Sequence, residues 1–167
     1  MKTKIFIKSF FILSIILMIS CNQTEKKEEK PTLKVENTEL KYDSIKAKKF
    51  GADDYGMKKF VIAFLYRGPN HDLSKEEKNK LQRAHLDNIN KLAEAGKLVL
   101  AGPFFGKDDL RGIYIFDVQS IEEAENLTKT DPAIIAGSLK MDLKEWYGSA
   151  ALMAINDLHT SIAKVNP

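Results

Sequence analysis

Residues 82–96 read QRAHLDNINKLAEAG, and residues 97–104 continue directly as KLVLAGPF. In the first stretch Ile89 and Leu92 recur at helical spacing, and His85 lies on the same stripe. The glycine that ends this stretch is typical of the left-handed residue that terminates a helix. The second stretch is apolar and short, as a buried strand is. The sequence therefore predicts a helix that leads directly into a strand, with a titratable ring on the helix face that packs against a sheet.

The pattern on both sides of this stretch predicts one domain with an α+β fold. Capping boxes, SKEE at residues 74–77 and SIEE at residues 120–123, indicate where two helices begin. The predicted elements in chain order are strand 59–66, helix 74–95, strand 97–102, strand 112–118, helix 120–129 and strand 138–147. This β-α-β-β-α-β order favours a ferredoxin-like antiparallel sheet with both helices on one face.

The strands predict that this sheet needs cover on its second face as well. Strand 59–66 and strand 112–118 carry apolar residues on both of their alternating sets. The helices can bury only one of the two faces. We therefore expect a second copy of the chain to pack on the other face, giving a homodimer that forms an α+β barrel.

The first residues resemble the signal sequence of a bacterial lipoprotein. Three lysines precede an apolar run of about ten residues at 10–19, which is too short to span a bilayer comfortably and has the size of a secretory signal. Ser20 precedes Cys21, the only cysteine of the chain. We expect residues 1–20 to be removed and Cys21 to be lipidated, which would hold the protein on a membrane of the bacterial cell envelope. An uncleaved N-terminal anchor is the alternative.

The remaining organisation follows from composition. Residues 21–55 are charged and poor in large apolar side chains, which predicts a flexible tether. Residues 56–155 form the predicted domain, and residues 156–167 a C-terminal tail. The first twenty residues hold three of the 26 basic residues and no acidic one, so 23 basic residues face 23 acidic residues in the rest. A neutral chain of this kind has no electrostatic footprint for nucleic acid, and that class is excluded.

His85 and Asp131 are the candidates for chemistry. A histidine on an apolar helical stripe is either a hydrogen-bonded core residue or a general acid or base, since imidazole can serve both roles near neutral pH. Asp131 precedes Pro132, a pair that is typical of a helix start with the carboxylate as cap. The cap and a role in orienting a histidine are compatible, because a carboxylate has several lone pairs.

Other side chains are candidates for binding a small molecule. Arg67 and Arg111 lie at strand ends and could meet an anionic substrate, although exposed arginines are commonly surface charges. The aromatic segment 146–149, WYGS, either lines a pocket or closes the barrel. The predicted ligand-binding residues are Arg67, Phe104, Trp146, Tyr147 and Ser149. No histidine lies at metal-ligand spacing and no phosphate loop is present, so we expect neither a metal nor a cofactor.

Five short motifs together resemble the YCII-related (YciI-like) family. They are HLDNI at 85–89, GKLVLAGPF at 96–104, GIYIF at 112–116, SIEEAENL at 120–127 and TDPAIIAG at 130–137. The resemblance covers about residues 58–148 and implies a dimeric α+β barrel related to muconolactone isomerase-like proteins. It also implies a His–Asp pair in a pocket between sheet and helix, with His85 and Asp131 at the two positions. The N-terminal signal, the tether and the WYGSAALM extension depart from the family pattern.

These observations lead to a principal functional hypothesis and two alternatives. The principal one is a membrane-tethered acid/base enzyme of isomerase or lyase type, which acts on a small cyclic or carbonyl compound through the His–Asp pair. The family implies such chemistry through members that process chlorinated or lactone ring compounds. The first alternative is a non-catalytic lipoprotein that binds a small ligand in the same pocket or serves as an accessory protein of the envelope. A structural envelope protein without a pocket is the second.

Overall fold

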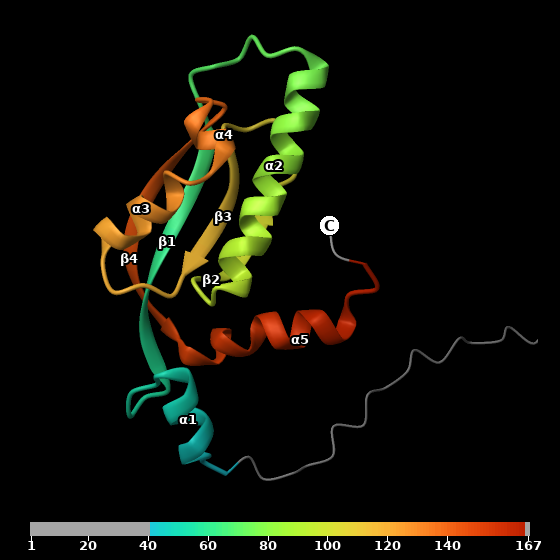
Figure 1. Ribbon diagram of the computed structural model, residues 1–167. Helices are drawn as coiled ribbons and strands as arrows, with labels where there is room; N and C mark the ends of the chain where they lie inside the picture. The colour runs from blue at the N-terminus through green and yellow to red at the C-terminus, as the bar shows by residue number, and fades with distance from the viewer. Residues whose placement is uncertain (1–40, 166–167) are drawn as a thin grey trace, which may run out of the picture. The chain divides into compact units, whose positions relative to one another are not determined.

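One antiparallel sheet organises the computed structural model, which describes residues 41–165 (Figure 1). The strands are β1 (Met57–Arg67), β2 (Leu98–Pro103), β3 (Leu110–Phe116) and β4 (Leu139–Ser149), in the spatial order β2-β3-β1-β4. The helices are α1 (Ser44–Phe50), α2 (Lys75–Glu94), α3 (Ile121–Thr128), α4 (Pro132–Ile135), the 3-10 helix η1 (Ala150–Ala154) and α5 (Ile155–Ile162). The predicted α+β class and its ferredoxin-like order are confirmed.

Both predicted helices begin where the sequence placed them, although only the box at Ser74 is complete. In the other box, the Glu123 carboxylate accepts from the Gln119 N–H and not from that of Ser120. The hydroxyl of Ser74 accepts from the Glu77 N–H at 3.2 Å, and the Glu77 carboxylate accepts from the Ser74 N–H at 2.8 Å. At the start of α3, the Ser120 hydroxyl accepts from the Glu123 N–H at 3.1 Å. These bonds satisfy N–H groups that a helix start leaves without partners, so local chemistry sets where the two long helical segments begin.

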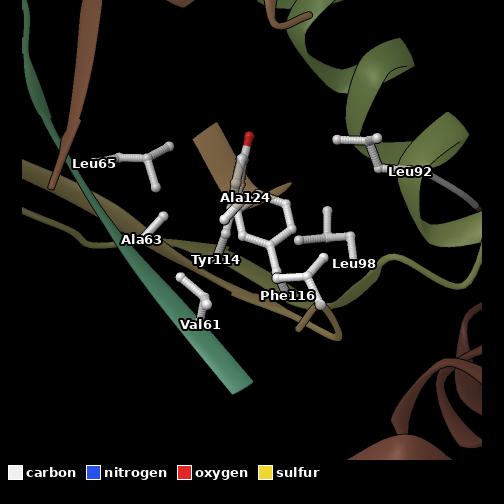
Figure 2. Close-up of a cluster of buried hydrophobic side chains, with 9 residues drawn as sticks. Val61, Ala63, Leu65, Leu92, Leu98, Tyr114, Phe116 and Ala124 are labelled. Atoms are coloured by element: carbon white, nitrogen blue, oxygen red, sulfur yellow. The ribbon is translucent and has the colours of Figure 1, made fainter. Parts of the chain in front are cut away.

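The main core lies between the sheet and helices α2 and α3 (Figure 2). Side chains from β1, β2 and β3 point toward α2 and α3 there, and Figure 2 shows Tyr114 among them. The buried members are Val61, Ala63, Leu65, Leu92, Leu98, Tyr114, Phe116, Val118 and Ala124. Tyr114 is the one side chain of this cluster with a polar atom, so its hydroxyl needs a hydrogen-bond partner.

The opposite sheet face is covered in part by the C-terminal segment. Phe60, Val99 and Ile115 form a second buried cluster, and Leu152 and Met153 of η1 pack against it. The amide of Asn156 in α5 donates to the carbonyl of Leu98 in β2 at 3.0 Å. Residues up to Ile162 therefore belong to the folded domain, where the sequence predicted a tail from residue 156 onward.

Helix α1 lies within the segment that the sequence predicted to be a flexible tether. The Asp43 carboxylate caps the Lys46 N–H at 2.9 Å, and Gly51 closes the helix at a left-handed φ of 67°. Cap and stop together define a single short helix, which also contacts η1. The prediction overlooked it because the apolar content of this stretch is low.

The turn after β1 brings distant parts of the backbone into contact. Gly68 donates to the carbonyl of Ser138 at 2.8 Å, and a Cβ at position 68 would lie 2.2 Å from the carbonyl oxygen of Gly137. Only a residue without a side chain fits such an approach. The end of β1 is thereby held against the start of β4.

The predicted signal sequence, Cys21 and residues 22–40 of the predicted tether lie outside the described residues. Among residues 41–165, no helix is both long and apolar enough to cross a bilayer.

Candidate functional site

His85 and Asp131 form a buried pair between α2 and the start of α4. His85 Nδ1 lies 2.8 Å from Asp131 Oδ2 and 3.0 Å from Oδ1. The aspartate is fully buried and the histidine is 8% exposed. The two residues are 46 positions apart in the chain, so it is the packing of α4 beside α2 that brings them together.

The carboxylate of Asp131 also begins α4. Its Oδ1 accepts from the Ala133 N–H at 2.8 Å, and Pro132 occupies the first helical position. The sequence expected a cap that could also orient a histidine, and the structure shows both contacts on one carboxylate. An ionised carboxylate only accepts hydrogen bonds, so Nδ1 of the neutral ring must carry the proton and Nε2 holds the lone pair.

Tyr114 provides the third polar group of the site. Its hydroxyl lies 3.2 Å from His85 Nε2 and 3.5 Å from Asp131 Oδ2. The two rings are stacked with centroids 6.1 Å apart. Burial raises the pKa of Tyr114, and the negative charge of Asp131 raises it further, so the phenol stays protonated. Its O–H can therefore donate either to the histidine lone pair or to the carboxylate.

The sequence reasoning missed Tyr114. It recognised the strand as GIYIF with alternating faces, which assigns the tyrosine and Phe116 to one face. The signal that could have identified Tyr114 is its hydroxyl, which needs a partner on the helix-covered face, where His85 also lies.

His85 forms part of the wall of a cavity of about 240 Å³. The cavity lies between α2, the end of β1, the beginning of β3, and the segment from α4 to β4. Its lining residues are Arg67, Lys78, Leu81, Gln82, His85, Arg111, Ala133, Ser138 and Leu139. Positions 78, 81, 82 and 85 share one face of α2, so helical periodicity could have found Lys78 and Gln82 once His85 was singled out.

Of the predicted ligand-binding residues, only Arg67 reaches this cavity. The register of β4 places Trp146 opposite Phe60 and Ser149 opposite Met57, at the beginning of β1, whereas the cavity lies at its end. There the Trp146 ring packs 5.9 Å from that of Phe60, the Tyr147 hydroxyl donates to Asp53, and the Ser149 hydroxyl caps η1. Phe104 follows β2 in the hairpin and is outside the lining.

The arrangement suits proton transfer. A neutral imidazole with its Nδ1–H held by a carboxylate has a basic Nε2, and the same carboxylate stabilises the imidazolium that forms when Nε2 takes a proton. Within the described part of the chain, no group of three or more His, Cys, Asp or Glu side chains could hold a metal ion.

Replacing Asp131 by asparagine is expected to reverse the tautomer of His85. Asparagine keeps an oxygen for the Ala133 N–H, so the helix cap survives, but its amide would donate to Nδ1 and move the ring proton to Nε2. Nitrogen-15 NMR of the imidazole measures this directly. Ser138→Ala, also in the cavity wall, should leave the tautomer unchanged. An Nδ1–H signal that persists in Asp131→Asn would contradict the assignment.

Comparison with known proteins places this chain in a family. The YCII-related domain model matches residues 59–159. An uncharacterised protein, YjpA, of Bacillus subtilis strain 168 is 32% identical over 62 residues, which is 37% of this chain and 71% of that protein.

A solved structure is also similar. It is 5-chloro-2-hydroxyhydroquinone dehydrochlorinase from Burkholderia phenoliruptrix AC1100 in complex with 2,5-dihydroxybenzoquinone. The identity is 23% and the TM-score 0.40, over 53% of this chain and 93% of that one. No residue role follows from a likeness at this level. The match of the domain model over more than half of the sequence shows that the chain belongs to the YCII-related family.

Proposed function

We propose that this protein is an acid/base enzyme of isomerase or lyase type for a small cyclic or carbonyl compound, with His85 as the base. The observation that carries the proposal is the His85–Asp131 pair in the wall of a cavity. General base catalysis needs a base that is oriented and that a substrate can reach. Here the buried Asp131 carboxylate orients the His85 ring, and the ring lines a cavity that could hold a substrate. The resemblance to the YCII-related family, which implies a His–Asp pair, supports the proposal.

The proposed reaction begins with proton removal beside a carbonyl group. His85 Nε2 takes the proton, and the electron pair of the broken C–H bond becomes part of an enolate. In an isomerisation the imidazolium returns that proton to another carbon of the conjugated system. In an elimination a neighbouring substituent departs with its bonding electron pair, and the proton remains on His85 until solvent removes it. The isomerisation needs only the site and the substrate, and the elimination needs in addition solvent to take the proton from His85.

Tyr114 has a defined part in this cycle. While His85 is neutral and acts as the base, its Nε2 lone pair must be free, so the tyrosine directs its O–H to Asp131 Oδ2, 3.5 Å away. Once Nε2 carries a proton, the hydroxyl oxygen, 3.2 Å away, accepts from Nε2–H while its own hydrogen stays directed at Asp131. The tyrosine thus acts as a positioning residue that suits both protonation states of the ring.

A deuterium-exchange experiment tests the proposed base. With a β,γ-unsaturated γ-lactone in D2O, the wild-type protein should catalyse deuterium incorporation next to the carbonyl, followed by proton NMR. His85→Asn should lower the rate by about 100-fold or more, as loss of a general base does. His159→Asn is the matched control, because His159 is exposed on α5 outside the cavity. Equal exchange by wild type and His85→Asn would refute the proposed base.

One observation favours the alternative function, non-catalytic binding of a small ligand. In the structure both nitrogens of His85 already have partners within the protein, Asp131 and Tyr114. A ring held in this way can be a structural wall of a binding pocket. In that case the wild-type protein would show no exchange above the buffer rate, and His85→Ala would retain ligand affinity.

Lipid anchoring is part of the proposal. It is supported by the three lysines, the apolar run and the position of Cys21, the only cysteine of the chain. Expression of the full chain in a bacterium with an alkyne-tagged fatty acid should label it, and the protein should sediment with membranes. Cys21→Ser should lose the label and move to the soluble fraction. Ser14→Ala, within the apolar run, is the control and should behave as wild type.

A homodimer through the helix-free sheet face also belongs to the proposal. Phe64 and Ile113 lie opposite each other on β1 and β3, half-buried and beyond the part that η1 covers. Charged side chains of β4, Lys140 and Asp142, flank them, which resembles an apolar interface with a polar rim.

Analytical ultracentrifugation tests this interface. The wild type is expected to sediment as a dimer, and Ile113→Glu as a monomer, because a charge in an apolar interface is left unpaired. Ile135→Glu is the matched control, since Ile135 is 71% exposed on the helix-covered side. A wild-type monomer, or a folded Ile113→Glu dimer, would contradict the interface.

A further inference from the structure

The cavity beside His85 carries an excess of positive charge. Its lining includes Arg67, Lys78 and Arg111, from three different elements. Among residues 41–165, no aspartate or glutamate lines this cavity. Asp131 lies beneath it, fully buried, and is already bonded to His85 and Ala133. Three cations around a small cavity create a field that attracts an anion.

Two of the three cations are largely free of carboxylate partners. Arg111 donates through Nη1 to the carbonyls of Gly106 and Asp108 at 3.2 and 3.3 Å, contacts that hold the guanidinium without neutralising it. Within residues 41–165 no carboxylate forms an ion pair with Lys78. Arg67 Nε lies 3.5 Å from the exposed carboxylate of Asp109, a surface pair with a small net contribution.

The rest of the wall is suited to a carbon skeleton. Leu81, Ala133 and Leu139 contribute apolar side chains, and the turn at Gly68 holds Arg67 close to Leu139. The volume of about 240 Å³ is below the roughly 300–1,000 Å³ of pockets for drug-sized ligands. It exceeds what a bare inorganic ion fills. The occupant therefore has both a charged group and a compact apolar part.

We propose that the ligand of this cavity is a small organic carboxylate, held by Arg67, Lys78 and Arg111 with its carbon skeleton against Leu81 and Leu139. The planar fork of a guanidinium matches the two oxygens of a carboxylate. The inference rests on the proposed function and deepens it. If His85 removes a proton from such a substrate, the same cations stabilise the negative charge that develops on the enolate oxygen.

Ligand titration followed by NMR tests this assignment on the full chain. The probes are benzoate, its neutral isostere benzamide, acetate and inorganic phosphate, and the signals are those of the His85 ring. Benzoate should bind saturably and at least about tenfold more tightly than benzamide, because a charge-assisted hydrogen bond is lost in the amide. Added salt should weaken benzoate binding.

Charge-removing variants identify the residues. Lys78→Gln and Arg111→Gln should each weaken benzoate by about tenfold. Lys80→Gln is the matched control, because Lys80 is on the same helix but outside the lining, and it should bind benzoate as the wild type does. Equal loss in Lys80→Gln, tighter binding of phosphate than of benzoate, or no saturable binding of any of the three anions would each overturn the proposal.

The two proposals fail in different ways. Benzoate binding that depends on Lys78 and Arg111, without lactone exchange by the wild type, would leave the carboxylate site standing and remove the acid/base function. Exchange that depends on His85, with benzamide bound as tightly as benzoate, would leave the base standing and remove the carboxylate site.

Discussion

The buried carboxylate of Asp131 is the constraint on which the rest of the site depends. A carboxylate out of contact with water is costly unless donors surround it. Here the donors come from three elements, since α4 supplies the Ala133 N–H, α2 the Nδ1–H of His85 and β3 the hydroxyl of Tyr114. Satisfying one charge therefore sets the start of α4, the rotation of α2 and the face of β3 relative to one another. The catalytic geometry we propose follows from the same contacts that make the fold specific.

Much of the fold could be predicted because local chemistry and tertiary packing agree. Ser74 and Ser120 begin helices through contacts within the first turn, which the sequence alone specifies. The alternation in the first residues of β4 reflects one covered face. For the site, His85 was accessible from periodicity and Asp131 from its place before proline. Their 2.8 Å contact, however, requires α4 to lie beside α2, which no local pattern specifies.

The parts that could not be predicted depend on register and on weak local signals. The aromatic composition of segment 146–149 suggested a pocket wall. The eleven-residue pairing of β4 with β1 instead places this segment beside the beginning of β1, at the far end of the strand from His85. Helices α1 and α5 have no buried residue. In α5, Ile155, Leu158 and Ile162 do recur at helical spacing, but the segment was predicted as a tail. The sequence predicted that Arg67 and Arg111 could meet an anion, but nothing in it singled out Lys78, which only the packing of α2 brings to the same cavity.

The order β2-β3-β1-β4 also governs how this chain can fold. The first strand of the domain is a central one, and both of its neighbours come later, β3 more than 40 residues on and β4 more than 70. During synthesis, β1 therefore leaves the ribosome with two unpaired edges and cannot complete its sheet until residue 149 has emerged. Because closing long loops costs entropy before the contacts form, such non-local pairing is slow and leaves an apolar strand open to association. Because the central strand is made first, the chain is most exposed to aggregation in the interval between synthesis of β1 and synthesis of β4.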